Sequence, residues 1–336
     1  MIKPIPMKTK FRQNFLYILI VIFTTTTYAG GSISDELIIG KNIDSVFISE
    51  TRIAFQRKME KGIYYVDLDS LNEHSKINKI ESPFATYNHT LIAIKNDFVF
   101  AGTSYDKGEE NTNYVYRIVS DGDLVKKWKT DAYYSFAIEG DSILGINLRE
   151  AFYLDKNGVT QAKFSIPAFA YFIDANNPNI VCKNPPISKT TDFYGYCYIR
   201  YDQKYKLLFK DYWDRHQIKS HKFGNEPILC GNKIAWISSL KRNSNTIKSF
   251  DLSSNKITEI MNTNDNSAIA CEANKLHLFS SENITHQNDD IIFHWIKNQK
   301  EPIKKAWIVN SNGVRYALLW QLDNTLKLVA LDQWCV

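Results

Sequence analysis

The chain has 336 residues, a formal net charge of +5 and an aromatic content of 13%, mostly Tyr and Phe. Residues 1–29 hold four basic side chains and no acidic one, so the rest of the chain is close to neutral, at +1. A surface of that charge lacks the electrostatic footprint of a protein that binds nucleic acid or an anionic membrane, and we exclude nucleic acid as a partner.

The first 29 residues are predicted to be a secretory signal peptide. Basic side chains come first, at Lys3, Lys8, Lys10 and Arg12. An uncharged apolar run of nine residues, Phe15–Phe23, follows, and Thr27-Tyr28-Ala29 supplies a small-x-small site for cleavage after Ala29. A membrane-spanning helix needs about 20 apolar residues, so this run is too short for an anchor. We therefore expect a periplasmic or secreted protein with no membrane span after cleavage.

Short strands separated by polar turns follow along the rest of the chain. In the first unit, strands are expected at 45–48, 52–56, 62–68 and 77–80, with Asp, Asn, Gly and Ser between them. Successive units share one landmark, an apolar strand that ends in Asp or Asn before a turn. The landmarks are Asp67, Asp121, Asp155, Asp202, Asp251, Asn298 and Asp332.

The spacing of these landmarks averages about 44 residues, which is the blade length of a four-stranded propeller. The sequence therefore predicts an all-β fold: a β-propeller of seven four-stranded blades that forms a single domain over residues 30–336. Rings of six or eight blades are also compatible with this spacing, and a β-sandwich is the alternative that short strands alone allow.

The last unit has no outer strand of its own. Glu36–Ile39, in contrast, is an apolar strand without an early partner. Pairing of this strand with the last unit would close the ring and remove an exposed sheet edge. We expect the two ends of the domain to be joined in this way.

Two distant phrases are nearly the same. Thr51–Phe55 leads into Ile63–Ser70, and Asn232–Trp236 leads into Ile247–Ser254, about four periods later. They resemble the Trp-Asp-like repeats of TolB-type periplasmic propellers, in which a Lys-Ile-Ala-Phe strand precedes a strand that ends in Asp-Leu. The Ser-Pro-Asp-Gly turn of that family is absent at both places. The resemblance implies a propeller and a role as a protein-binding platform.

Five cysteines follow the signal: Cys182, Cys197, Cys230, Cys271 and Cys335. An odd number leaves at least one thiol free or paired with another molecule. Cys182 and Cys197 flank a predicted hairpin, so they are the disulfide candidates in an oxidising compartment. The chain has no C-x-x-C motif, which argues against a zinc site.

The candidate binding loop lies between the fourth and fifth units. It offers an aromatic face, a carboxylate, a guanidinium and two imidazoles to a sugar, peptide or metal. Its residues are Trp213, Asp214, Arg215, His216 and His221. The competing interpretation is a solvated connection with Trp213 packed between blades.

Other polar groups are expected to be structural. Asp67 and Asp69 do not fit a calcium loop and are interpreted as turn residues. His277 and His294 fall within strands and are expected to be packed, and Lys304-Lys305 is expected to be a solvated strand end. We expect neither a metal nor a cofactor.

No nucleophile elbow, metalloprotease helix, phosphate loop or dinucleotide fingerprint is present in the sequence. Our hypothesis is a monomeric, exported, non-catalytic propeller that binds a protein or glycan partner through one face of the ring. The alternative is a propeller enzyme, such as a lyase, lactonase or glycoside hydrolase, with a site in the central funnel. No catalytic residue can be assigned, because such sites are assembled from loops of several blades.

Overall fold

The computed structural model describes twenty segments of the chain. They are residues 36–49, 51–58, 60, 62–71, 75–80, 90–94, 97–104, 112–118, 124–130, 135–139, 142–147, 149–154, 160–183, 194–202, 204–212, 226–241, 244–263, 267–280, 290–296 and 301–331. The predicted signal peptide and the loop at 213–221 lie outside these segments. Within them the regular structure is β-strand apart from one short 3-10 helix, and no helix is long and apolar enough to cross a membrane.

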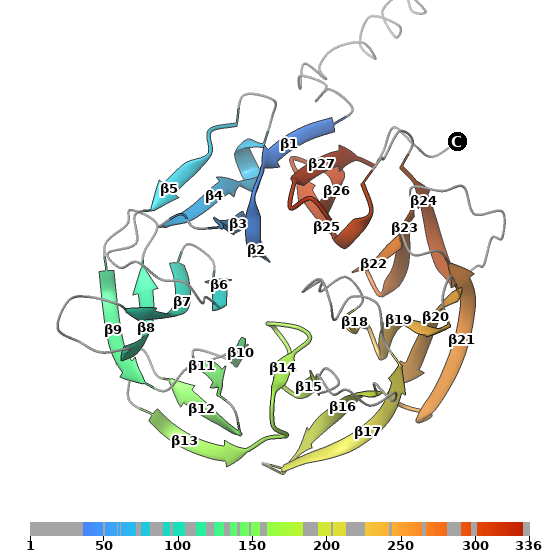
Figure 1. Ribbon diagram of the computed structural model, residues 1–336, viewed down its shortest axis with the longest axis horizontal. Coiled ribbons are helices and arrows are strands. Elements are labelled where there is room, and N and C mark those ends of the chain that lie inside the picture. The colour runs from blue at the N-terminus through green and yellow to red at the C-terminus, as the bar shows by residue number, and fades with distance from the viewer. Residues whose placement is uncertain are drawn as a thin grey trace, which may run out of the picture.

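The strands form sheets arranged around a ring, so the fold is a β-propeller (Figure 1). The first two sheets contain β2 (Ile43–Ile48), β3 (Arg52–Arg57), β4 (Ile63–Asp67) and β5 (Asn78–Ile80), then β6 (Thr90–Ile94), β7 (Asp97–Ser104), β8 (Thr112–Ile118) and β9 (Leu124–Thr130). The helix η1 (Leu68–Ser70) follows β4. The next two contain β10 (Ser135–Glu139), β11 (Ser142–Ile146), β12 (Glu150–Leu154) and β13 (Thr160–Ser165), then β14 (Ala170–Phe172), β15 (Ile180–Lys183), β16 (Tyr194–Tyr201) and β17 (Lys204–Tyr212).

The second half of the chain forms three further sheets. One sheet contains β18 (Ile228–Cys230), β19 (Lys233–Lys241), β20 (Ser244–Asp251) and β21 (Lys256–Thr263). A three-stranded sheet contains β22 (Ser267–Glu272), β23 (Lys275–Ser280) and β24 (Ile291–Trp295). The last contains β25 (Ile303–Ser311), β26 (Val314–Gln321), β27 (Leu326–Ala330) and β1 (Glu36–Gly40).

The described residues form six four-stranded blades, so the prediction of seven such blades is wrong in number. The remaining sheet, β22–β24, has three strands, and its β24 runs parallel to β23. A meander of three antiparallel strands would leave the chain at the opposite face of the ring. The parallel strand returns it to the side on which β25 must begin, and the polar insertion at 283–289 supplies the longer connection that parallel pairing requires.

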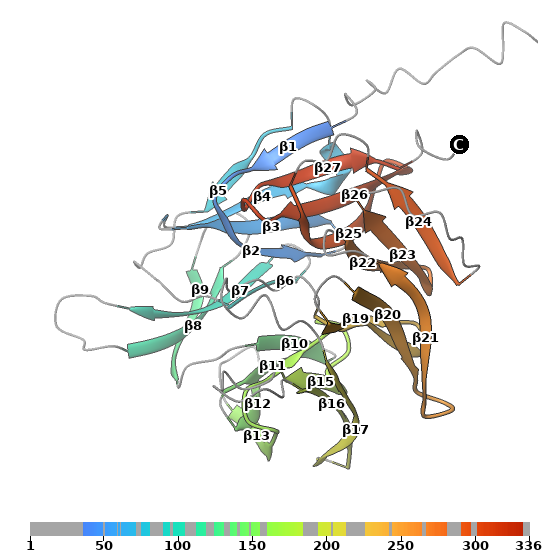
Figure 2. The ribbon, with the colours of Figure 1, turned by 45° about the vertical axis from the view of Figure 1, so that its right-hand side comes forward.

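The predicted pairing of the early strand with the last unit is present. β1 lies antiparallel to β27, with Glu36 opposite Val329 and Leu37 opposite Leu328. Figure 1 and Figure 2 both show β1 beside β27, as the outer strand of a sheet that otherwise belongs to the C-terminal part of the chain. The pairing gives β27 a hydrogen-bonded neighbour on each side.

The two repeated phrases occupy equivalent places. They form the second strands β3 and β19, and their central apolar residues are all fully buried: Ile53, Ala54 and Phe55, and Ile234, Ala235 and Trp236. One backbone hydrogen bond is repeated too. Leu68 N donates to Thr51 O at 2.8 Å. Leu252 N donates to Asn232 O at 3.0 Å. The two similar phrases therefore form equivalent strands with the same buried residues and the same turn.

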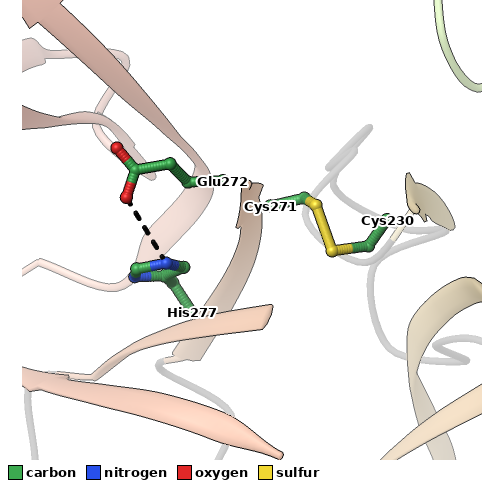
Figure 3. The surroundings of a disulfide bond; sticks show 4 residues. All are labelled: Cys230, Cys271, Glu272 and His277. Atoms are coloured by element: carbon green, nitrogen blue, oxygen red, sulfur yellow. Dashed lines mark ion pairs between the residues drawn. A yellow bond between two sulfur atoms is a disulfide. The ribbon is translucent and has the colours of Figure 1, made fainter. Parts of the chain in front are cut away.

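Two disulfides reinforce the described part of the ring. Cys182 and Cys197, the pair expected from the sequence, lie directly opposite each other in β15 and β16, with 4.1 Å between their Cα atoms. The second, Cys230–Cys271, joins the inner strands of two neighbouring sheets, β18 and β22 (Figure 3). Cys335 lies outside the described residues.

Candidate functional site

One face of the ring carries the connections from each sheet to the next. The innermost strands, β2, β6, β10, β14, β18, β22 and β25, lie nearest the centre in Figure 1. Because four antiparallel strands return the chain to its starting side, each inner strand begins on the same face, and each second strand ends there. We call this the linking face. Binding residues concentrate on connections held by a rigid scaffold, so this face is the place to search.

The predicted binding loop belongs to one of these connections. It joins Tyr212, at the end of β17, to Glu226, which precedes β18. Its candidate residues, Trp213, Asp214, Arg215, His216 and His221, lie outside the described residues, so their role stays a prediction. The described groups of the linking face therefore define the candidate site.

Charged side chains from separate segments gather on this face. We call Asp44, Lys58, Glu226, Lys304 and Lys305 the linking-face cluster. Asp44 and Lys304 occupy matching positions. Each is the extra residue of a β-bulge near the start of its inner strand, β2 or β25. A bulge re-aims side chains and interrupts strand pairing, and bulges are common next to functional sites.

Lys304 is buried, so the expectation of a solvated strand end is wrong for this residue. Its side chain keeps only 8% of its accessible surface, and its Nζ lies 3.5 Å from the centre of the Trp320 ring. Burial, together with the charges of Lys58 and Lys305, lowers the pKa of Lys304 to about 8, while Asp44 and Glu226 oppose the shift. Strongly shifted pKa values concentrate at functional sites.

Lys305 connects two distant parts of the ring. Its Nζ lies 3.3 Å from Glu226 Oε2. This ion pair links the start of β25 to the segment immediately before β18. Both side chains are partly exposed, at 30% for Lys305 and 21% for Glu226. Lys58 is held beside the start of β2, because its N–H donates to Asn42 O at 2.7 Å. The cluster is thus positioned by backbone and side-chain contacts.

Aromatic side chains border the same face. Burial, with a smaller contribution from Glu226, raises the pKa of Tyr171 well above its usual range. Tyr171 nevertheless retains some accessible surface, which fits a side chain enclosed on most sides and open on one. Two residues earlier, Phe169 lies in the connection from β13 to β14 and is 67% exposed. This places a large apolar group in solvent on the linking face.

The backbone of Phe169 is unfavourable for its side chain. Its φ is +60°, in the left-handed region, which costs a residue with a Cβ roughly 1–2 kcal/mol. Bulky residues there are outliers, and strained positions occur preferentially at functional sites. An exposed Phe side chain contributes little to the core, so packing in the core does not explain why a Phe occupies this strained position.

The histidines are structural, as the sequence indicates. His277 and His294 are 1% and 8% exposed, and His277 Nδ1 and His294 Nε2 share a hydrogen bond at 2.8 Å. His277 Nε2 lies 3.7 Å from Glu272 Oε2, beside the Cys230–Cys271 disulfide (Figure 3). In the part of the chain that the structure describes, no group of three or more His, Cys, Asp or Glu side chains is placed to hold a metal ion.

The Asp67 and Asp69 pair forms a turn, as expected. Asp67 Oδ1 accepts a hydrogen bond from Arg52 Nε at 2.7 Å, and the short helix η1 follows directly. Asp121, the landmark of the second unit, lies outside the described residues. Sequence reasoning missed Lys304 and Glu226 as site residues, because neither a bulge nor an ion pair between two sheets has a local sequence signal.

Comparison with known proteins finds distant structural similarities only. No family model matches the chain, and no curated protein matches it. Structures with a similar fold include the β-propeller domain of the Trilobed protease from Pyrococcus furiosus, 11% identical over 84% of this chain and 90% of that one, with a TM-score of 0.46. TolB from Acinetobacter baumannii is 13% identical over 88% of this chain and 66% of that one, with a TM-score of 0.38. A chain of the Saccharomyces cerevisiae complex of Dbp5 with Nup159 and Gle1 is 8% identical over 89% and 94%, with a TM-score of 0.48.

Proposed function

We propose that the protein is an exported, non-catalytic β-propeller that binds a protein or glycan partner through its linking face. The observation that carries this proposal is Phe169, a bulky apolar side chain that is 67% exposed at a positive φ. Aromatic residues are enriched at interfaces, where they supply the largest contact areas. A strained and exposed Phe is explained if a partner covers it.

Export is supported by the cysteines as well as by the sequence of residues 1–29. Disulfides persist in secreted and periplasmic proteins and are rare where cytosolic reductants act. The described residues include two, Cys182–Cys197 and Cys230–Cys271. We therefore infer that residues 1–29 are a signal peptide and that the mature protein resides in the periplasm or outside the cell.

We also infer that residues 30–336 form one domain, a monomeric ring that β1 closes. The antiparallel pairing of β1 with β27 supports closure, since it ties the first described strand to the last. Closed rings remove sheet edges that would otherwise pair with other chains. A rigid, closed ring would hold the connections of the linking face in fixed positions for a partner.

Partner capture tests the proposed function. The full chain, with a C-terminal affinity tag, is used to retain partners from an extract of its own envelope and medium. We expect Phe169→Ala to lose a retained partner that wild type holds. Tyr201→Ala is the matched control: Tyr201 is 65% exposed and ends β16, away from the linking face. Equal retention by wild type and Phe169→Ala would exclude Phe169 as an anchor.

A further inference from the structure

We infer that the partner of the linking face is a protein, and that this protein receives the Phe169 side chain in an apolar pocket. The inference rests on the proposed function and narrows it, because it selects a protein over a glycan. We call residues 166–170, which connect β13 to β14, the linking-face turn. The shape, the anchoring and the composition of this turn indicate the class of partner.

The linking-face turn projects the Phe169 side chain from the surface. Ala170 N donates a hydrogen bond to Pro167 O at 3.2 Å. This bond closes a β-turn whose two central residues are Ala168 and Phe169. The φ of Phe169 is +60°, as at the second central position of a type II turn, where Gly or Asn is usual. With 67% of its surface exposed, the Phe169 ring makes the tip of the turn convex.

The base of the turn is fixed on both sides. Ile166 N donates to Arg149 O at 2.9 Å, and Phe172 N donates to Ser135 Oγ at 3.0 Å. Ile166, Ala170 and Phe172 are all buried in one core cluster. The exposed ring therefore stands on a backbone that is held before any partner arrives. Such preorganisation favours affinity, because little freedom of the turn remains to be lost on binding.

The composition of the turn fits an apolar pocket and does not fit a sugar. Its side chains, Ile-Pro-Ala-Phe-Ala, contain neither nitrogen nor oxygen. Sites for small ligands are concave and use a few placed polar groups to fix the orientation of the ligand. A convex, apolar tip provides neither feature for the hydroxyl groups of a sugar. It is suited to fill a cavity in another protein, since aromatic anchors at interfaces occupy desolvated pockets.

Photo-crosslinking from position 169 tests the class of partner. The full chain carries p-benzoylphenylalanine at this position and is irradiated in a preparation of its own envelope and medium. We expect the tryptic fragment that contains residue 169 to carry a peptide of another protein. The same probe in place of Tyr201, which is 65% exposed at the end of β16, should not capture that peptide. A fragment that carries a saccharide, a fragment joined to a second copy of this chain, or the lack of any adduct would overturn the inference.

Competition by folded variants tests the apolar pocket. An excess of the untagged wild-type chain should suppress the adduct. Phe169→Met and Phe169→Gln are a matched pair, because the two side chains have the same length and differ in polarity. Burial of the Gln amide without a hydrogen-bonding partner is costly, so Phe169→Met should compete at least about tenfold better than Phe169→Gln. Equal competition by the two variants would contradict an apolar pocket. Thermal melts of each variant report whether it is folded.

The inference and the proposed function fail separately. If the adduct carries a saccharide, or if Phe169→Met and Phe169→Gln compete equally, the inference is wrong while the linking face still binds through Phe169. If Phe169→Ala retains every partner in the capture experiment, the proposed anchor is wrong, and the inference is wrong with it.

Discussion

Asp211 Oδ2 accepts a hydrogen bond from Trp236 Nε1 at 2.9 Å, and this bond joins two blades. Asp211 belongs to β17, the outer strand of one blade, and Trp236 to β19, the second strand of the next. Lys248 Nζ lies 3.2 Å from the same oxygen, and all three residues are buried. The aromatic residue of the second repeated phrase therefore connects blades as well as filling the core.

Trp236→Phe tests this connection. The first phrase has Phe55 at the equivalent position, so the strand accepts the smaller ring, but the hydrogen bond and some packing are lost. We expect the free energy of unfolding to fall by about 1–3 kcal/mol. Urea denaturation measures it. In an Asp211→Ala background, which lacks the acceptor, the loss should be smaller; additive losses would mean that the two residues do not interact.

The histidine pair predicts an acid-labile three-stranded sheet. Burial, then Arg315 and Lys275, lowers the pKa of His277 to about 4. Burial, then His277 and Arg315, lowers the pKa of His294 to about 4, with Glu272 opposing. An unfolded histidine titrates near 6.5, so between these values the unfolded chain binds more protons. Stability is therefore fully present above pH 6.5 and decreases as the pH falls to about 4.

The free energy of unfolding should fall by roughly 3 kcal/mol for each histidine that must be protonated. Denaturation midpoints measured from pH 7.5 to pH 4.5 show the slope. The double variant His277→Gln and His294→Gln keeps hydrogen-bonding groups without this titration, so its profile should be flatter. Equal slopes in the two proteins would show that other groups cause the acid sensitivity.

The strands of the repeated phrases could be predicted because their signals are local: a buried apolar run, then a turn at Asp67 or Asp251. The pairing of β1 with β27 followed from counting strands at the two ends. The parallel strand β24 could not be predicted, since its direction depends on where the chain must leave the sheet. The linking-face cluster was hidden for a similar reason, because Lys304 and Glu226 are 78 positions apart in the sequence.

The two disulfides differ in what the sequence reveals. Cys182 and Cys197 flank one hairpin, so their proximity is a local expectation. Cys230 and Cys271 belong to different sheets, and pairing between such cysteines cannot be deduced from their spacing. Only the order of the sheets around the ring places β18 beside β22.

Removing either disulfide should destabilise the protein, and the loss should be larger for the bond that closes the longer loop. The Cys230–Cys271 bond closes a separation of 41 residues and Cys182–Cys197 one of 15. Chain entropy then predicts losses of about 4 and about 3 kcal/mol for replacement of each pair by alanine. Unfolding of the two double variants in urea gives the comparison. A larger loss from the shorter loop would show that local packing outweighs the constraint on the unfolded chain.

Phe169→Gly separates stability from binding at the linking face. Glycine adopts a positive φ without the steric cost that Phe169 bears, although it adds entropy to the unfolded chain. We expect the variant to be as stable as wild type or up to about 1 kcal/mol more stable. It should nevertheless lose the partner, because the exposed ring is gone. Thermal unfolding and partner capture measured on the same preparation test both halves. A destabilised Phe169→Gly would show that the ring contributes to folding, and the argument that strain at this position serves binding would no longer hold.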